Sequence, residues 1–351
     1  MKAIINVGLV GYGFASKTFH APLIQATEGL DLVAVSSSDA AKVKAGLPNV
    51  EIESQALALC RHPDLDLIVI PTPNDTHFPL AKAALLAGKH VVVDKPFTVT
   101  FSEAKQLKAL AVDKERLISV FHNRRWDSDF LTIQALLKEG TLGRMTGFES
   151  RFDRFRPEVR DRWREKATPG GGIWYDLGPH LLDQVCELFG MPNAILLELG
   201  MRRDGAKADD DFLCLLEYDG FRVCLSAGTL VAEPTPRFRI HGTKGSYTKY
   251  GLDPQEERLK DGEIPSPHWG VDTPGTLALN EDENESASIQ HREHPTLPGN
   301  YLAYYQGVAA ALRDSAPLPV NIDDALRSMM LLEAGLDSHR QRRWIALKPH
   351  L

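Results

Sequence analysis

Apolar runs alternate with segments of helical periodicity through the first third of the chain. The runs predict strands at residues 4–10, 30–35, 65–70, 91–93 and 117–121. Predicted helices lie between them, up to residue 26, at 75–87 and at 102–112. Continuous apolar strands separated by helices are typical of a parallel sheet covered on both faces. We therefore predict an α/β fold that opens with a doubly wound parallel sheet over residues 1–122.

The pattern changes after residue 122. A predicted helix at 126–138 is followed by alternating runs, which predict strands at 145–152, 194–201, 212–218, 221–230 and 237–241. Asp219 and Gly220 lie between two of these runs and are typical of a two-residue hairpin turn. Residues 123–351 are therefore predicted to form a second, α+β domain with an open, mostly antiparallel sheet.

The last hundred residues begin with a segment rich in proline, glycine and charge. This segment, 251–299, predicts a long loop region with one short helix at 255–260. Late helices are predicted at 301–312 and 323–338, and a last strand at 344–347. We find no internal repeat.

The composition of the 351 residues, 43% hydrophobic and 25% charged, is that of a soluble protein long enough for two packed domains. The net charge of -7 gives no basic footprint for nucleic acid, and no apolar run reaches the length of a membrane span. The apolar start of the chain is too short for a signal peptide. We therefore expect a cytoplasmic protein without nucleic-acid or membrane partners.

Four cysteines, at positions 60, 186, 214 and 224, show no paired spacing of the kind that metal sites use. Each lies in an apolar context, where cysteine behaves as a small core residue. We expect no metal site and no disulfide bond.

A glycine turn separates the first predicted strand from the first helix. Gly11 permits a tight turn, Gly13 lets backbone N–H groups approach a pyrophosphate, and Ser16 allows close packing of helix on strand. The position between strand and helix, with a second strand following, favours a dinucleotide site over a plain loop.

The end of the second strand determines which nicotinamide cofactor fits. NAD-binding domains usually place an acidic residue there, which holds the ribose 2'-hydroxyl. This chain instead has three serines at 36–38, which can accept a 2'-phosphate, and Lys42 or Lys44 can add positive charge. NADP is therefore favoured over NAD. The alternatives are that Asp39 binds the ribose, or that the serines cap the next helix.

Polar residues follow three consecutive strands of the first domain. They occupy positions 71–74 with His77, then 94–96, then 122–126. Ligands of parallel sheets bind beyond the carboxyl ends of the strands, so these residues favour a binding site over a surface loop.

A second glycine turn, Gly170-Gly171-Gly172, precedes a predicted helix that carries a polar stripe. Asp176, His180, Asp183 and Gln184 recur at helical spacing, opposite a face of leucines, so we expect the stripe to point out of the core. Taken alone, such an Asp and His are more often a surface pair than an acid/base couple.

Several motifs together resemble the glucose-fructose oxidoreductase / inositol dehydrogenase (Gfo/Idh/MocA) family. They are the residues at 11–13, 71–77, 87–91 and 94–97. Further runs at 119–131 and 156–160 resemble the subgroup of NADP-dependent scyllo-inositol dehydrogenases and their uncharacterised bacterial relatives. Asp94 departs from the family pattern, which usually has Glu there. The resemblance extends essentially from end to end and implies a Rossmann domain followed by a sheet domain that often forms homodimers or homotetramers.

The chemistry that fits is hydride transfer between a nicotinamide and a secondary alcohol. Oxidation needs a base for the hydroxyl proton, and histidine titrates near working pH, so His180 is the candidate. Asp176 can orient the ring, and Lys95 can hydrogen-bond the reacting oxygen. The resemblance implies that these three residues act together as the catalytic set.

The remaining candidate site residues fall into two groups. For the cofactor we expect Gly11, Tyr12, Gly13, Phe14, Ser16, Ser36, Ser37, Ser38, Pro71, Thr72, Asn74, His77, Asp94, Lys95 and Asn123. For a cyclic polyol or sugar substrate we expect Lys95, Asn123, Arg124, Trp126, Asp153, Arg160, Trp163, Tyr175, Asp176, His180 and Asp183.

Some of these candidates have structural alternatives. Arg124 and Arg125 can instead pair with Asp127 or Asp129 on the surface, and Trp163 can be a core aromatic residue. His77 is favoured as a structural or cofactor residue over a catalytic one. His20 shows no partner pattern and is expected to be exposed or capping.

Two classes of function fit the sequence. The first is an NADP-dependent polyol or sugar dehydrogenase, with scyllo-inositol among the candidate substrates, or a sugar or carbonyl reductase working in the opposite direction. The second is a catalytically silent regulator or sensor that binds the cofactor on the same fold. The presence of both Lys95 and His180 favours the enzyme.

Overall fold

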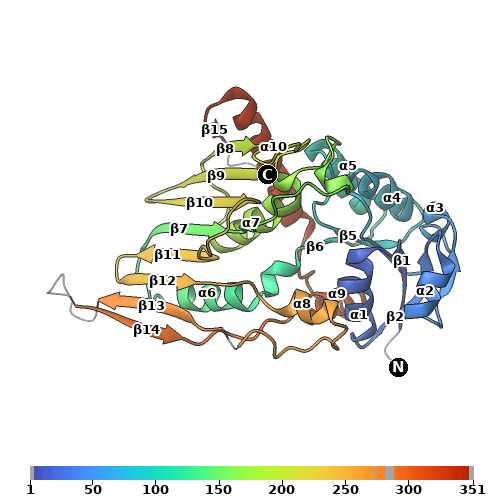
Figure 1. Cartoon of the computed structure of the whole chain (residues 1–351). Helices are drawn as coiled ribbons and strands as arrows, with labels where there is room; N and C mark the ends of the chain where they lie inside the picture. The colour runs from blue at the N-terminus through green and yellow to red at the C-terminus, as the bar shows by residue number, and fades with distance from the viewer. Residues whose placement is uncertain (1–3, 272, 281–287, 348–351) are drawn as a thin grey trace. The chain divides into compact units, whose positions relative to one another are not determined.

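The computed structural model describes residues 4–271, 273–280 and 288–347, which form two compact units (Figure 1). The first unit contains the chain up to Trp126 together with Pro254–Pro267 and Asn300–Met329. The second contains Asp127–Asp253, His268–Gly299 and the chain from Met330. Each unit therefore combines stretches that are far apart in the sequence.

A six-stranded parallel sheet with the order β3-β2-β1-β4-β5-β6 is the centre of the first unit. Every residue of β4 and β6 is buried, which requires cover on both faces, as predicted for a doubly wound fold. The strands are β1 (Ile5–Val10), β2 (Leu30–Ser36), β3 (Glu51–Glu53), β4 (Leu67–Ile70), β5 (His90–Asp94) and β6 (Ile118–Phe121). The helices are α1 (Ala21–Gln25), α2 (Ala40–Gly46), α3 (Ala56–Leu59), α4 (Asn74–Leu86) and α5 (Phe101–Asp113).

Two helices from later in the chain, α8 (Gln255–Lys260) and α9 (Leu302–Asp314), complete the first unit. The Tyr304 hydroxyl donates to Ser119 Oγ at 2.9 Å, and the Tyr305 hydroxyl lies 2.6 Å from His20 Nδ1. The ring of Phe121 packs against Tyr304, with centroids 5.0 Å apart. The prediction that His20 is exposed or capping is wrong, because its ring is fully buried in this aromatic cluster.

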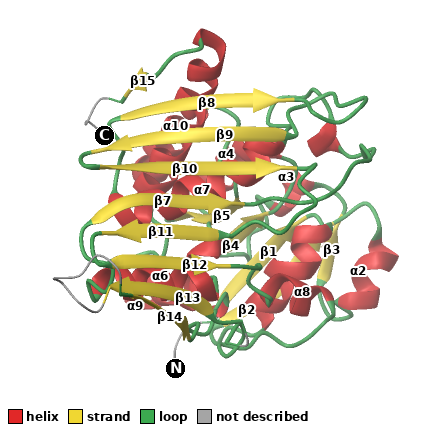
Figure 2. Cartoon of the chain, turned by 60° about the vertical axis from the view of Figure 1, so that its left-hand side comes forward, coloured by secondary structure: helices red, strands yellow, loops and turns green. Residues whose placement is uncertain are grey.

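The second unit contains a nine-stranded sheet with the order β14-β13-β12-β11-β7-β10-β9-β8-β15 (Figure 2). Among the strand pairs that the structure describes in this sheet, only β7–β10 is parallel, so the predicted open, mostly antiparallel sheet is confirmed. Its strands are β7 (Met145–Arg151), β8 (Ala194–Gly200), β9 (Asp211–Tyr218), β10 (Phe221–Gly228), β11 (Phe238–Gly242), β12 (Gly245–Lys249), β13 (Gly275–Asn280), β14 (Ile289–His294) and β15 (Ile345–Ala346).

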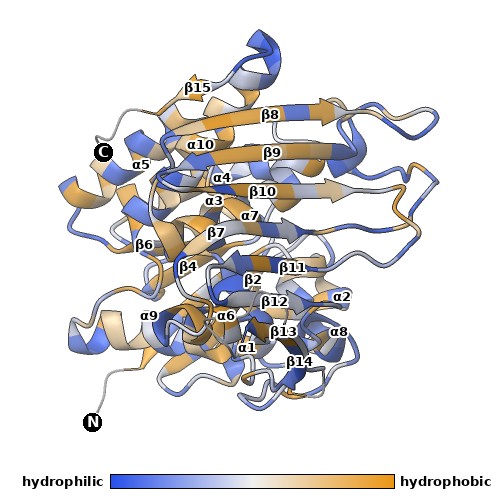
Figure 3. Ribbon diagram, turned by 90° about the vertical axis from the view of Figure 1, so that its left-hand side faces the viewer, coloured by the Kyte–Doolittle hydropathy of each residue, from blue (hydrophilic) through white to orange (hydrophobic). Residues whose placement is uncertain are grey.

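Helices cover one face of this sheet. They are α6 (Ser128–Lys138), α7 (Ile173–Phe189) and the C-terminal part of α10 (Ile322–Gln341), and Figure 2 shows α6 and α7 behind the strands. The fully buried Trp174 of α7 packs edge-on against Phe212, and its Nε1 donates to the carbonyl oxygen of Leu332 at 3.1 Å. The opposite face, turned toward the viewer in Figure 3, carries partly exposed apolar and charged side chains.

The segment 251–299 differs from its prediction as a long loop. The short helix has the expected bounds at Gln255–Lys260, but β13 and β14 also form there and pair with β12 at the edge of the sheet. Five of the six residues of β14 are exposed, so this edge strand has no apolar face that a periodicity could reveal. Residues 272 and 281–287 of the segment lie outside the described residues.

Three of the four cysteines are core residues. Cys60, Cys186 and Cys214 are buried, Cys224 is half-buried, and all four are free thiols. Burial raises the pKa of the Cys60 thiol to about 11, which keeps it neutral and unreactive. Among the helices that the structure describes, none combines the length and the apolar character needed to cross a bilayer.

Candidate functional site

The glycine turn after β1 has the backbone geometry of a phosphate-binding loop. Gly11 has a φ of 83°, and its N–H donates to the carbonyl oxygen of Ser36 at 2.9 Å, which ties the turn to the end of β2. A methyl group added at Gly13 would meet no atom within 4 Å, so space is open beside the loop. A helix begins at Phe14, and its first N–H groups lack partners within the helix. The loop therefore fits a dinucleotide pyrophosphate.

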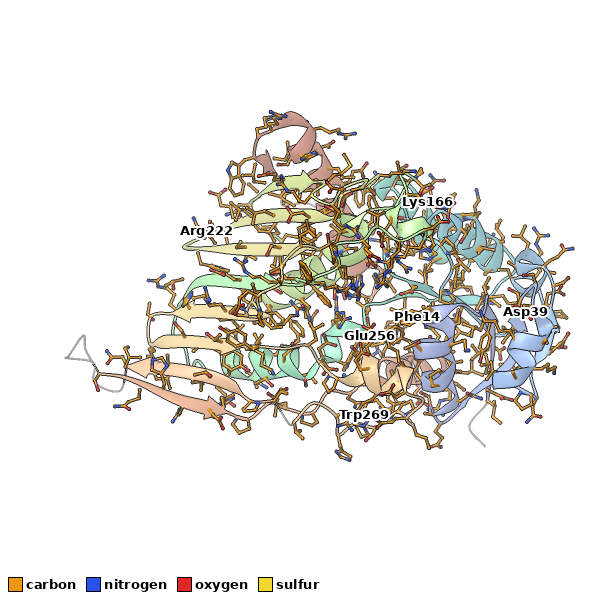
Figure 4. The ribbon with its side chains drawn as sticks, in the orientation of Figure 1. Phe14, Asp39, Lys166, Arg222, Glu256 and Trp269 are labelled. Carbon is orange, nitrogen blue, oxygen red and sulfur yellow. The ribbon has the colours of Figure 1, made fainter. Side chains whose placement is uncertain are left out.

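The side chains of the turn differ in their exposure. Tyr12 and Ser16 are buried, with 7% and 1% of their surface exposed. Phe14 is exposed, and Lys260 Nζ of α8 lies 5.6 Å from the centre of its ring (Figure 4). Of these three predicted cofactor residues, Phe14 presents its side chain at the surface, whereas the side chains of Tyr12 and Ser16 are buried within the unit.

The three serines at the end of β2 have different roles. Ser36 is buried and its hydroxyl accepts a second bond from the Gly11 N–H at 3.2 Å, whereas Ser37 is half-buried and Ser38 is exposed. Asp39 caps α2, because its Oδ1 accepts from the Lys42 N–H at 3.0 Å (Figure 4). The Ser37 hydroxyl accepts from the Asp39 N–H at 3.1 Å, so the serines also stabilise the turn into α2, and the Asp39 carboxylate is held at the helix start.

The Lys44 ammonium group is bound by backbone carbonyl groups of its own segment. Its Nζ donates to the carbonyl oxygens of Pro48 and Val50, at 2.9 and 2.6 Å. Lys42 is exposed on the first turn of α2 and remains a candidate for phosphate contact.

His77 joins two of the polar strand ends. Its Nδ1 lies 2.8 Å from the carbonyl oxygen of Pro96, after β5, and its Nε2 lies 2.9 Å from that of Thr72, after β4. The ring is fully buried, and burial lowers its pKa. This is the structural alternative considered for His77, and it places the residue beside the peptide that follows Lys95.

The third strand end, Asn123–Trp126, is more enclosed than expected. Arg124 and Arg125 are 6% and 7% exposed and bind Glu256 at 2.9 Å and Asp324 at 3.2 Å (Figure 4). The suggested location on the surface is therefore wrong, because both side chains are buried and bind partners on α8 and α10, more than a hundred residues away. Asn123 is 5% exposed and lies in the same short 3₁₀ helix.

In the second unit, Gly172 and Asp209 fix the start of α7. Gly172 has a φ of 90°, which favours glycine. Asp209 Oδ2 accepts from the Trp174 N–H at 2.7 Å, and the Asp209 carbonyl oxygen accepts from the Ile173 N–H at 2.8 Å. A side-chain carboxylate from outside the helix thus satisfies its first turn, and the sequence pattern did not reveal this cap.

The first two turns of α7 carry the predicted acid/base pair. Asp176 is half-buried, and its Oδ1 lies 3.3 Å from Arg164 Nε. His180, one turn later, is 6% exposed. The structure therefore brings Asp176 and His180 together on one helix of the second unit; Lys95 belongs to the first unit, and its approach to them stays a prediction.

The rest of the polar stripe does not point out of the core. Asp183 and Gln184 are 2% and 1% exposed, and Gln184 Oε1 accepts from Arg237 Nη2 at 3.1 Å. The expectation of an outward-facing stripe is wrong for Gln184, because the buried Arg237 at the start of β11 binds it.

The other predicted substrate residues of the second unit differ in their contacts and in their exposure. Asp153 holds backbone, accepting from the Gly228 N–H at 3.1 Å and from the Thr235 hydroxyl at 2.7 Å. Trp163 is half-buried with the Arg164 guanidinium 4.4 Å above its ring, so it is not a core aromatic residue. Tyr175 is half-buried and Arg160 is exposed.

In the described part of the chain, no group of three or more His, Cys, Asp or Glu is placed to hold a metal ion.

Comparison with known proteins extends these observations to both halves of the chain. Residues 5–122 match the NAD-binding Rossmann domain of the GFO/IDH/MocA oxidoreductase family, and residues 134–347 match its C-terminal alpha/beta domain. The uncharacterized oxidoreductase YdgJ of Escherichia coli K12 is 55% identical over 99% of this chain and 100% of its own length.

Two further relatives are informative. The scyllo-inositol 2-dehydrogenase (NADP(+)) IolW of Bacillus subtilis is 36% identical over 98% of this chain and 96% of its own length. The solved structure of an oxidoreductase from Yersinia pestis is 53% identical, has a TM-score of 0.94, and covers 100% of this chain and 99% of its own.

Proposed function

Because the chain belongs to the GFO/IDH/MocA oxidoreductase family, whose NAD(P)-binding Rossmann domain it contains, we propose that it transfers a hydride between NADP and a secondary alcohol of a cyclic polyol or sugar. Scyllo-inositol is the first candidate, since a relative 36% identical along almost the whole chain carries that activity in its name. The observation that carries the proposal is the placement of Asp176 and His180 one turn apart on α7.

Three side chains share the chemistry in this proposal. His180 takes the hydroxyl proton during oxidation and returns it during reduction. Asp176 orients the imidazole, and Lys95 donates a hydrogen bond to the reacting oxygen. The bound nicotinamide supplies the hydride chemistry, and the protein positions the substrate against it.

We propose NADP as the preferred cofactor. The turn at Gly11–Gly13 would hold the pyrophosphate, and the hydroxyl groups of Ser37 and Ser38 would donate hydrogen bonds to the 2'-phosphate. The support is that β2 ends in hydroxyl groups, and that the nearby Asp39 carboxylate is occupied in capping α2.

The substrate would contact a smaller set of side chains than the sequence suggested. We propose Lys95, Trp163, Tyr175, Asp176 and His180 as direct contacts. Arg124 and Asp153 are supporting residues in this proposal, because Glu256 binds the first, and the second holds the Gly228 N–H and the Thr235 hydroxyl.

The decisive experiment is a panel of inositols and common sugars, assayed with NADP and with NAD by the absorbance of the reduced nicotinamide. We expect turnover with NADP, and a loss of roughly 100-fold or more in kcat for Lys95→Ala and His180→Ala. Lys105→Ala, on the exposed surface of α5, is the matched control and should retain activity. A protein that binds NADP yet neither oxidises a polyol nor reduces the corresponding ketone would instead be a regulator.

We also propose that the uncovered face of the nine-stranded sheet pairs two copies of the chain. Leu213 is 42% exposed there, and Leu215 is paired with Cys224 on the neighbouring strand. Apolar side chains on an open sheet face are stabilised when a second surface excludes water from them. Light scattering should give a dimer or tetramer, and Leu213→Asp should shift it toward monomer.

We further propose a cytoplasmic location. All four cysteines are free thiols, and the half-buried Cys224 faces the uncovered side of the sheet. Reducing compartments keep such thiols unpaired. Cell fractionation with a tagged chain tests this proposal.

A further inference from the structure

Arg164 contacts two residues to which the proposed function gives a role in the reaction. Its Nε lies 3.3 Å from Asp176 Oδ1, and its guanidinium carbon lies 4.4 Å from the centre of the Trp163 ring. Asp176 is the carboxylate proposed to orient His180, and Trp163 is a proposed substrate contact. The side chains of Arg164 and Asp176 are 34% and 24% exposed. Ion pairs with this much exposure add little to stability, so the contact matters for the direction in which the side chains point.

The backbone of the same segment binds the first turn of α7. The Gly172 N–H donates to the Arg164 carbonyl oxygen at 2.8 Å, and the Gly172 carbonyl oxygen accepts from the Asp176 N–H at 3.1 Å. A methyl group at Gly172 would clash with the carboxylate of Asp209, which caps the helix, so glycine permits this close junction. The backbone and the side chain of Arg164 therefore both bind the helical turn that presents Asp176.

The other side of the segment is fixed as well. Glu165, the next residue, is 8% exposed. Its carboxylate accepts from the Arg160 N–H at 2.9 Å and from Arg162 Nε at 2.6 Å, and Arg203 Nη1 lies 3.0 Å from it. Arg203 belongs to the loop before β9, so the short 3₁₀ helix that contains Arg164 and Glu165 is bound on two sides. Its neighbours therefore determine the position of the Arg164 backbone.

Arginine is suited to two different contacts at once. Its guanidinium is planar, with N–H donors along the edge and a face that stacks on aromatic rings. In this structure the edge nitrogen Nε faces the carboxylate, and the group lies over the indole. Lysine would retain the charge near Asp176 but has no planar face for Trp163. The two contacts restrict the rotamers of both neighbours, and reaction rates are sensitive to such placement at the scale of about 1 Å.

We propose that Arg164 is a positioning residue of the proposed reaction. It holds the Asp176 carboxylate in the orientation in which that group directs His180, and it holds the Trp163 ring where the substrate binds. The inference rests on the proposed function and adds to it a residue that transfers neither the hydride nor the proton. Loss of the first contact should lower kcat, and loss of the second should raise KM for the substrate.

Two substitutions of Arg164 separate the contacts, assayed with NADP and the polyol of the panel that is turned over fastest. Arg164→Met keeps much of the side-chain length and removes both contacts, so we expect kcat to fall by about 10-fold and KM for the polyol to rise by about 3-fold. Arg164→Lys retains the charge beside Asp176 but lacks the planar face, so kcat should recover most of the loss while KM stays raised. A purely structural role would lower the melting temperature without this split between kcat and KM.

A double substitution tests whether Arg164 acts through Asp176. In an Asp176→Asn background the carboxylate is already gone, so adding Arg164→Met should lower kcat by less than about 2-fold more. Losses in kcat that simply multiply would show that Arg164 acts on the reaction without Asp176, which contradicts a positioning role.

Fluorine NMR gives a readout that needs no turnover. The chain contains five tryptophans, so labelling with 5-fluorotryptophan gives five signals, of which Trp163→Phe identifies one. Arg164→Met should shift that signal, because the guanidinium no longer lies over the ring. The matched control is Lys166→Met, which removes a charge from the same segment; the Lys166 side chain is 54% exposed and binds Asp161 at 2.9 Å (Figure 4). It should leave the signal, kcat and KM unchanged, and melting curves check that each variant is folded.

The two proposals fail in distinguishable ways. Values of kcat, KM and the Trp163 signal that are the same for Arg164→Met and Lys166→Met would overturn the positioning role while the parent enzyme still turns over polyols. A kcat that Arg164→Lys does not recover would overturn it as well. A parent protein that binds NADP but turns over none of the panel would instead overturn the dehydrogenase, and with it the role of Arg164 in catalysis, even where the Trp163 signal still responds to Arg164→Met.

Discussion

His77 Nδ1 lies 2.8 Å from the carbonyl oxygen of Pro96, in a peptide adjacent to the proposed catalytic Lys95. The other ring nitrogen faces the carbonyl oxygen of Thr72, so one buried side chain connects the segments that follow β4 and β5. Both segments carry residues proposed for the cofactor or the reaction. His77 is therefore a positioning residue in our interpretation.

Replacing His77 with leucine should disturb both stability and catalysis. Because burial keeps the ring neutral, it donates to one of the two carbonyl oxygens, and the leucine removes that donor, which we expect to cost about 1 to 3 kcal/mol in the free energy of unfolding. The Lys95 segment loses its anchor, so kcat should fall together with the affinity for the dinucleotide. Urea unfolding and steady-state kinetics measure the two effects.

His77→Gln distinguishes the effect of the side-chain hydrogen bond from the effect of the side-chain volume. Its amide can still donate to one carbonyl oxygen, so we expect it to recover part of the lost kcat. Equal activity of the leucine variant, the glutamine variant and the parent protein would show that the connection does not position Lys95.

The buried His20 should make stability depend on pH. Burial lowers the pKa of His20 to about 4, whereas histidine in an unfolded chain titrates near about 6.5. Between these values the unfolded state binds more protons, so the free energy of unfolding decreases as the pH falls. Urea unfolding at about pH 7 and about pH 5 gives the difference in the free energy of unfolding between the two pH values. We expect His20→Gln to reduce this difference by roughly 1 to 2 kcal/mol. His291→Gln, on the exposed β14, should leave the difference unchanged.

A carboxylate at the end of β2 should reverse the preference between the two cofactors. Ser37→Asp would repel the 2'-phosphate of NADP and accept the ribose hydroxyls of NAD. We expect KM for NADP to rise by about 10-fold or more while KM for NAD falls. The control is Ser102→Asp, which adds the same charge at an exposed position on α5 of the same unit. Equal changes for the two cofactors would argue against a phosphate site at Ser37.

Gly335 tests the packing between α10 and α7. Alanine usually stabilises a helix interior by about 1 kcal/mol relative to glycine. Here the new Cβ would lie 2.8 Å from Cζ2 of the fully buried Trp174 and 3.1 Å from Leu197 Cδ2, and such overpacking costs about 1 to 3 kcal/mol. We therefore expect Gly335→Ala to lower the free energy of unfolding, with a smaller loss in a Trp174→Phe background. An increase in stability would show that Trp174 and Leu197 can shift to accommodate the added methyl group.

The sequence predicted the elements whose side chains follow a strict pattern. The strands β1, β4, β5 and β6 are apolar runs because both of their faces are covered, and α8 has the predicted bounds because its short polar helix is set off by proline and glycine. The edge strand β14 was missed, since exposed residues need no apolar alternation.

The local geometry of candidate site residues was predictable where a short motif determines it. Gly11 and Gly13 occupy a turn whose backbone dictates glycine or open space, and Asp176 and His180 follow helical spacing. The contacts of Arg124 with Glu256 and of Asp209 with the start of α7 join positions far apart in the chain. Periodicity and short motifs contain no information about such pairs.

The first unit is assembled from segments that are far apart in the sequence, and this has a consequence for synthesis on the ribosome. Its aromatic cluster joins His20 and Phe121 to Tyr304 and Tyr305, and its last stretch ends only at Met329. The nascent nucleotide-binding unit therefore cannot close its core until the ribosome has translated residues 300–329. Until then Phe121 lacks Tyr304 and Tyr305, and the growing chain presents to chaperones a surface that these two rings later cover.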